Sequence, residues 1–216
     1  MTSVTAPDLV MRREDGTELS TLVWWFAEQV SCVSTAAVGG GFAQCSWIVN
    51  AQVCEGYRRT DLHTHAADIA AAMQLSGNGA VMFTAVDVRE RQTADVGGAL
   101  VTATVGLRDP SWAADVGAPA QTRTESVMGT VNLVVQLPVP MDSGAMVNLV
   151  ATVTEAKCQA FAAERVPGTG TPTDAVTIVC PTGVHTEQFG GPRSTWGSRA
   201  ASAVYQAVTA GLRVGN

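Results

Sequence analysis

Two kinds of apolar stretch alternate along the chain. Most are rich in β-branched and aromatic residues and are bounded by glycine or proline, which is typical of strands. Others repeat apolar residues every three or four positions, which predicts amphipathic helices. The pattern predicts strands at 21–38, 46–53, 79–88, 98–107, 129–140 and 175–180, and helices at 61–76, 141–164 and about 194–212.

This order of elements indicates an α+β fold in a single domain. Consecutive strands with interspersed helices favour one mixed β-sheet of about six or more strands, packed by three main helices. Residues 1–20 are polar and mixed in charge, so we expect an edge segment or a partly ordered lead-in to a domain at 21–216. The chain has 216 residues, 46% of them hydrophobic, which is enough for one sizeable core.

Charge and composition narrow the possible partners. The formal net charge is −6, and the 13 lysines and arginines form no basic cluster, so we expect no nucleic-acid partner. No stretch of about 18 apolar residues occurs, so no membrane span is expected. The small charged surface allows a homo-oligomer. The five cysteines are odd in number and lack C-x-x-C spacing, which favours the cytoplasm over a disulfide-bonded protein.

Motifs for metals and phosphates are weak or absent. No G-x-x-x-x-G-K-[ST] sequence occurs. His63 and His65 form an H-x-H near Asp61 and Asp68. On a helix, side chains two residues apart point about 200° apart, so both cannot bind one ion. We interpret the motif as a polar helix start and expect neither a metal site nor a cofactor.

The sole lysine, Lys157, is the first candidate for chemistry. On a helical wheel it lies about 40° from the centre of the apolar stripe of helix 141–164, whereas Glu155 lies on the opposite side. Lys157 therefore belongs to the buried face. Either its stem covers apolar surface and its ammonium reaches a rim, or the ammonium is held in a cleft.

A second candidate is Asp174, which follows "GTGTPT" and precedes a buried strand. It is either a turn aspartate that accepts backbone N–H bonds or a general base. Thr171 and Thr173 flank it as hydrogen-bonding groups. No lysine follows the glycines and the loop enters a strand, so we do not interpret it as a phosphate site.

Several polar residues in apolar surroundings are further candidates. Asn132 and Asn50 lie in strands, where a buried amide must be hydrogen-bonded, either to a loop or to a substrate. Ser34 is a nucleophile only if a base lies beside it. The remaining candidates are Gly39, Gly40 and Gly41, which permit close backbone approach, and Arg193 and Ser194, at a helix start that suits anions or amide carbonyls.

Four of these stretches, in order, resemble the adenosylcobinamide amidohydrolases of corrinoid salvage. They are "STAAVGGGFAQCSWIVNAQV" (34–53), "GTVNLVVQLPVPMDSGAMVNLVATVTEAKCQAF" (129–161), "GTGTPTDAVTIVC" (168–180) and "GPRSTWGSRAASAVYQAV" (191–208). The resemblance covers roughly residues 30 to 210.

The resemblance implies hydrolysis of the amide that joins a corrin propionate to aminopropanol, which gives adenosylcobyric acid. The corrinoid is then a substrate, and no cofactor is implied. Asp174, Lys157 and Glu155 become the catalytic candidates. The substrate-binding candidates are Ser34, Gly39, Gly40, Gly41, Asn50, Asn132, Thr171, Thr173, Arg193 and Ser194.

One position departs from the family pattern. Many members have Gly-Thr-His-Thr before the last helix, whereas this chain has Gly191-Pro192-Arg193-Ser194. The missing histidine favours an alternative, a non-catalytic corrinoid- or tetrapyrrole-binding protein with the same pocket. A hydrolase for a different amide is a third possibility.

Overall fold

A computed structural model describes residues 4–108, 110–114 and 129–214. It confirms an α+β fold with a mixed sheet and three α-helices. The strands are β1 (Asp8–Glu14), β2 (Thr17–Ser34), β3 (Gly41–Gln52), β4 (Gly79–Thr84), β5 (Gln92–Val96), β6 (Ala99–Val105), β7 (Val131–Gln136) and β8 (Ala175–Pro181). The helices are α1 (Leu62–Ala72), α2 (Ser143–Ala163) and α3 (Thr195–Val214), with a short 3₁₀ helix, η1, at Val88–Glu90.

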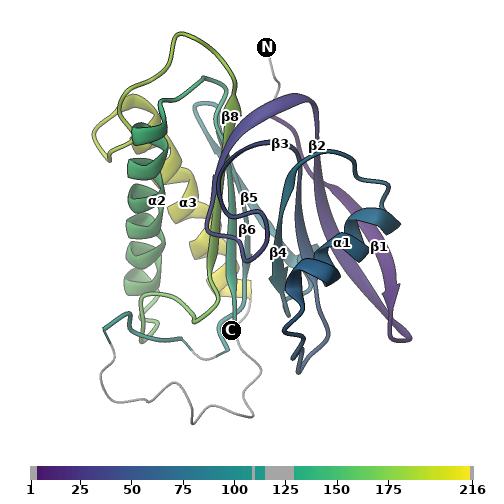
Figure 1. Cartoon of the computed structure of the whole chain (residues 1–216). Helices are drawn as coiled ribbons and strands as arrows, with labels where there is room; N and C mark the ends of the chain where they lie inside the picture. Colours follow the sequence, from purple (N-terminus) through teal and green to yellow (C-terminus); the bar gives the residue numbers. More distant parts are fainter. Residues whose placement is uncertain (1–3, 109, 115–128, 215–216) are drawn as a thin grey trace.

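The strands form one sheet in the order β4-β3-β2-β8-β7-β6-β5, and β1 pairs with β2. The pairs β3–β4 and β7–β8 are parallel, and the other pairs are antiparallel. In Figure 1, α2 and α3 lie on one side of the molecule, and α1 lies on the opposite side, beside β1 to β4.

The sheet folds back on itself because β2 is long and bent. Its register with β3 shifts between Trp25 and Val30. Beyond this irregularity, residues 30–34 of β2 also pair with β8. As a result β3 faces β7 across the interior, where the Asn132 Nδ2 donates to Asn50 Oδ1 at 2.8 Å.

Side chains of β7 show how this arrangement separates two cores. Val131, Leu133 and Val135 alternate toward α2 and α3, where they meet residues such as Leu149. Val134 points the other way, into an inner core that includes Trp24 and Met82. A third core packs α1 against β3 and β4. Asn132 lies on the same face of β7 as Val134, so its amide is in the interior of the curled sheet.

The structure differs from the sequence-based elements in several places. β2 starts and ends four residues earlier than expected, and β3 starts five residues earlier. Within the polar segment 1–20, where an edge segment was one of the two expectations, residues 8–14 form an edge strand that pairs with β2 through a turn at Asp15 and Gly16, both at positive φ. The strand expected at 79–88 ends at Thr84, because the Asp87 carboxylate accepts the Arg89 N–H and starts η1. The polar strand β5 at 92–96 was not predicted. The loop expected at 108–125 lies largely outside the described residues.

None of the helices in the described part of the chain is long and apolar enough to cross a membrane.

Candidate functional site

A buried ion pair joins α2 to the loop before β8. Lys157 Nζ donates to Asp174 Oδ2, and the two side chains are 7% and 13% exposed. The prediction that Lys157 lies on the buried face of its helix is therefore confirmed. An ion pair so far from water needs further hydrogen bonds to balance its desolvation.

The carboxylate of Asp174 accepts four hydrogen bonds. Oδ1 accepts the Val131 N–H at 2.8 Å and the Thr171 hydroxyl at 2.5 Å. Oδ2 accepts the Thr171 N–H at 3.1 Å as well as the Lys157 ammonium. A carboxylate has about four lone-pair sites, so these donors occupy its full capacity. In this arrangement Asp174 anchors its neighbours and has no lone pair left to take a proton.

Lys157 is less fully engaged than its partner. An ammonium carries three N–H donors, and among the described residues only Asp174 accepts one of them. The ring of Phe161 lies 6.0 Å from Nζ and adds a weak cation–π contact. Lys157 is therefore a fixed cation with donor capacity to spare.

Two glycines in the loop at 168–174 allow it to pack this closely. A Cβ at Gly168 would lie 2.8 Å from both backbone N and O of Ser111. A Cβ at Gly170 would collide with both charged groups of the Lys157–Asp174 pair. Hydrogen bonds between Ser111 and the backbone of Thr169 and Gly170, each 2.9 Å, hold the loop in place.

Thr173 lies next to the ion pair but does not contact it. Its hydroxyl is 2.7 Å from that of Thr130 and donates to the Gly129 carbonyl at 3.2 Å. It therefore ties the loop to the segment that leads into β7.

Asn132 and Asn50 meet in the interior, one residue away from the Val131 N–H that binds Asp174. Asn132 Nδ2 donates to Asn50 Oδ1 and to the Phe83 carbonyl, the latter at 3.1 Å. Asn50 Nδ2 donates to Thr104 Oγ1 at 3.0 Å. Asn132 Oδ1 has no partner among the described residues. This amide network connects β3, β4, β6 and β7 behind the ion pair.

Ser34 also lies in the interior, without a base beside it. Its hydroxyl is 2.7 Å from that of Thr177 and accepts the Ala36 N–H at 3.0 Å. Neither partner removes a proton from an alcohol, so these contacts do not make Ser34 a nucleophile.

The glycine run has a packing role in this structure. A Cβ at Gly39, which has φ +73°, would collide with the backbone of Gly79 and Ala80. Gly40 lies against the Ala36 carbonyl, and Gly41, at φ +90°, faces open space. The close backbone approach expected at Gly39 and Gly40 therefore takes place between segments of this chain.

Three other candidates lie apart from the ion pair. Glu155 is exposed on the far face of α2. Arg193 is exposed, and Ser194 caps α3, since its hydroxyl accepts the Gly197 N–H at 3.0 Å. The adjacent Gly191 packs near Asn148 of α2, nine residues and therefore about 14 Å along the helix from Lys157. The structure does not bring Arg193 and Ser194 to the Lys157–Asp174 pair.

The H-x-H motif is not simply a polar helix start, because His65 is only 2% exposed. Its Nδ1 lies 2.6 Å from the Tyr57 hydroxyl, and its Nε2 lies 3.0 Å from Glu14 Oε1. The Nε2–H is poorly aligned with that oxygen, so the second contact is a close polar approach and not a well-formed hydrogen bond. The described residues contain no cluster of three or more potential metal ligands.

The sequence analysis did not predict that His65 is buried with polar partners, although the sequence contains a sign of it. His65 is three residues after Leu62 and four before Ile69, so it lies on the apolar stripe of the helix. A histidine on a buried stripe needs polar partners, which here come from Tyr57 and Glu14.

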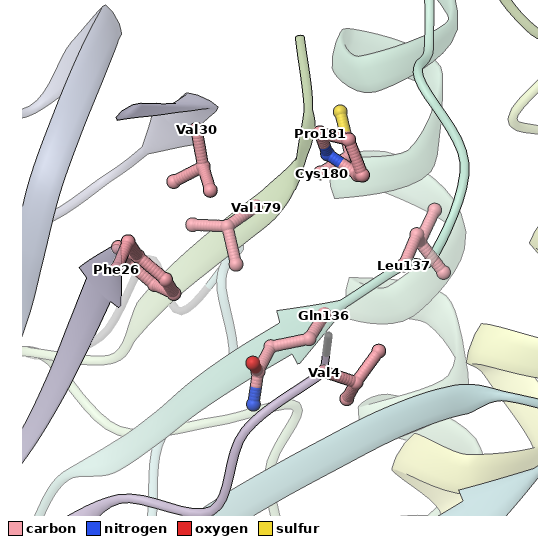
Figure 2. A pocket seen from close by; sticks show the side chains of 8 residues that line it. All are labelled: Val4, Phe26, Val30, Gln136, Leu137, Val179, Cys180 and Pro181. Atoms are coloured by element: carbon pink, nitrogen blue, oxygen red, sulfur yellow. The ribbon is translucent and has the colours of Figure 1, made fainter. Parts of the chain in front are cut away.

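A small apolar pocket lies at the opposite end of β7 and β8 (Figure 2). It measures about 230 Å³ including its open mouth, and its walls include Phe26, Val179 and Leu137. Pockets for drug-sized ligands are about 300–1,000 Å³. Burial raises the pKa of the Cys180 thiol in its wall to about 11, so the thiol is protonated at neutral pH. The pocket is therefore smaller than a site for a drug-sized ligand, and its cysteine is not activated as a nucleophile.

Two comparisons with known proteins give the same description. The family model described as adenosylcobinamide amidohydrolase matches residues 6–216. A curated protein of Halobacterium salinarum, named adenosylcobinamide amidohydrolase, is 28% identical over 177 residues, which cover 80% of this chain and 76% of that protein.

Proposed function

The chain belongs to the adenosylcobinamide amidohydrolase family, and from this premise we propose that it hydrolyses the amide between a corrin propionate and aminopropanol in adenosylcobinamide. The products are adenosylcobyric acid, which can re-enter cobalamin assembly, and free aminopropanol. The observation that carries the proposal is the family match, because it spans residues 6–216 and so includes every candidate residue above.

Lys157 has the properties that the proposed reaction needs at the amide oxygen. As the amide carbon becomes tetrahedral, its oxygen gains negative charge, and fixed donors in a site shielded from water stabilise that charge most. The Lys157 side chain is 7% exposed, and its ammonium is held by Asp174 and has N–H donors that no described residue accepts. We assign it to the carbonyl oxygen of the scissile amide.

Asp174 acts through Lys157 in this proposal. Its four accepted hydrogen bonds fix the ammonium and join it to β7 and to Thr171. Asp174 is therefore a positioning residue. Asn132 and Asn50 connect the strands behind the pair, and Thr173 holds the loop beside it.

We further propose that the reaction takes place in the cytoplasm, where thiols stay reduced. Support comes from the cysteines, since all five are free. The corrinoid enters the proposal as substrate, with no additional cofactor.

Incubation of the purified protein with adenosylcobinamide tests the proposal. Chromatography and mass spectrometry should detect adenosylcobyric acid and aminopropanol in equal amounts. The variant Lys157→Met should lose most of this turnover, whereas Gln159→Ala, an exposed change on the same helix, should retain it. Absence of both products would reject the proposed reaction.

An alternative function is corrinoid or tetrapyrrole binding without hydrolysis. Two observations favour it: Arg193 stands where many family members have histidine, and Asp174 has no lone pair left to act as a base. A spectral change on mixing with adenosylcobinamide, with no product after long incubation, would support this alternative.

A further inference from the structure

Trp112 is the most exposed of the five tryptophans. It is 55% exposed, whereas Trp24, Trp47 and Trp196 are at most 9% exposed. An indole is a large apolar group that a folded protein usually covers in good part. Single exposed apolar side chains are nonetheless common, so the surroundings of Trp112 decide whether it has a function.

The backbone on both sides of Trp112 is bound to the loop before β8. Ser111 donates its N–H to the Gly170 carbonyl and accepts the Thr169 N–H, each at 2.9 Å. Ala113 donates its N–H to Thr169 Oγ1 at 3.2 Å. These three hydrogen bonds fix the backbone around Trp112. A ligand that contacts the indole therefore does not have to order the segment that carries it.

The same loop brings Trp112 within reach of the ion pair. A Cβ at Gly170 would lie 2.5 Å from Lys157 Nζ, and the Gly170 carbonyl accepts the Ser111 N–H. With standard bond lengths, these contacts place the Cα of Trp112 within about 14 Å of Nζ. A ring system that carries an amide on a short side chain can therefore contact the indole and the ammonium together.

A further hydrogen bond ties this arrangement to α2. Cys158 directly follows Lys157, and its thiol donates to the Thr169 carbonyl at 3.2 Å. Thr169 thus binds Ala113 through its hydroxyl and Cys158 through its carbonyl. The segment that carries Trp112 and the helix that carries the ammonium are joined through this one residue, so their separation is fixed.

The proposed substrate needs more contact than the ion pair provides. Lys157 is assigned to one amide oxygen, whereas adenosylcobinamide is a broad, flat ring system with amide side chains at its edge. Ligands of this kind are bound mainly by apolar and aromatic side chains. The pocket beside Val179 measures about 230 Å³ and lies at the other end of β8, so it does not serve the ring.

We propose that Trp112 is a substrate-binding residue whose indole packs against the corrin ring while Lys157 holds the scissile amide. The inference rests on the proposed function, since it assigns the contact that holds the same substrate. Trp112 takes no part in proton transfer or in bond cleavage. Its contact forms before the reaction and persists through it, so it stabilises the bound substrate and the transition state equally.

The variant Trp112→Ala tests this contact. We expect the Kd for adenosylcobinamide, measured by equilibrium dialysis, to rise about 10-fold or more, as for other truncated aromatic anchors. KM should rise in parallel and kcat should stay within about twofold, the pattern of lost uniform binding. The matched control is Trp25→Ala, a 42% exposed tryptophan on β2, opposite Trp47 of β3. It should match the wild type in Kd, KM and kcat.

A second variant and a second ligand sharpen the assignment. Trp112→Phe keeps an aromatic ring, so its Kd should lie between those of the wild type and Trp112→Ala. Dicyanocobinamide keeps the corrin ring and lacks the adenosyl group, so Trp112→Ala should weaken its binding by a similar factor. An effect seen with adenosylcobinamide alone would place the indole against the adenosyl group and overturn the contact with the ring.

The outcomes separate this inference from the proposed function. Unchanged Kd and KM in a folded Trp112→Ala, beside an active wild type, would overturn the role of Trp112 alone. A wild type that binds adenosylcobinamide without cleaving it rejects the hydrolysis, and the Kd comparison then still decides the role of Trp112. A wild type that neither binds nor cleaves it overturns both.

Discussion

Two polar clusters lie at the same end of the sheet and differ in how their hydrogen bonds are made. In the Lys157–Asp174 pair, the carboxylate is bound by two backbone N–H groups, a hydroxyl and an ammonium. In the second cluster, formed by Tyr57, His65 and Glu14, only side chains meet, and Tyr57 is half-buried. The comparison indicates that the pair fixes a loop and a charge, whereas the Tyr57–His65–Glu14 cluster joins α1 to β1 through side chains alone.

The largest expected effect on stability comes from removing the cation of the pair. Lys157→Met leaves the Asp174 carboxylate buried without its counter-charge, and breaking a buried pair in this way costs about 3–5 kcal/mol. Urea unfolding measures this loss. Gln159→Ala, two residues along α2, should change the free energy of unfolding by no more than about 0.5 kcal/mol. A loss below about 1 kcal/mol for Lys157→Met would show that the pair does not hold the loop.

A smaller loss of stability is expected when a methyl group is added beside the pair and both charges are kept. In Gly170→Ala the new methyl group would collide with Asp174 and Lys157, and overpacking of this kind costs about 1–3 kcal/mol. Gly144→Ala is the matched control, because no atom lies within 4 Å of its added Cβ, at the start of α2. Alanine is the better helix former, so this control should be neutral or slightly stabilising. Equal effects in the two variants would contradict the close packing at Gly170.

The carboxylate of the Tyr57–His65–Glu14 cluster should matter less to stability than the pair does. Glu14→Gln weakens the bonds to Arg12 and His65, but Glu14 is 20% exposed and water can replace part of them. We expect a loss of about 1–2 kcal/mol in the free energy of unfolding. Glu18→Gln, the same change at an exposed site of β2, serves as the control. A loss as large as that of Lys157→Met would remove the distinction between the two clusters.

The smallest expected effect is a loss of stability at acidic pH. Hydrogen bonds from Arg59 lower the pKa of Asp61, the residue before α1, to about 2. Because this folded-state pKa lies below the ordinary value, the contribution to stability is present above about pH 4 and is lost as pH falls to about 2. The difference in urea midpoint between wild type and Asp61→Asn should therefore vanish over this range. A difference that persists at pH 2 would show that Asp61 acts through its shape and not its charge.

The sequence predicted the helices and the apolar strands well, because their signals are local. Helix 141–164 was predicted within two residues, and the wheel correctly placed Lys157 on its buried face. The strands at 8–14 and 92–96 lie at edges of the sheet and bury few side chains, so their sequences lack an apolar pattern.

The site was harder to predict because it depends on contacts between distant segments. Asp174 was singled out from its turn, but its four donors come from three segments, including α2 and β7. His65 was misread because its partners lie 8 and 51 positions away, at Tyr57 and Glu14. The bend in β2 that brings Asn50 to Asn132 has no signal in the sequence that we recognise.

The most direct test of the account is hydrolysis of adenosylcobinamide in water enriched in ¹⁸O. If the protein cleaves the C–N bond of the amide, the carboxylate of adenosylcobyric acid gains one ¹⁸O atom and the released aminopropanol gains none. Mass spectrometry of both products measures this. Adenosylcobyric acid without the label, or no adenosylcobyric acid at all, would contradict the proposed hydrolysis.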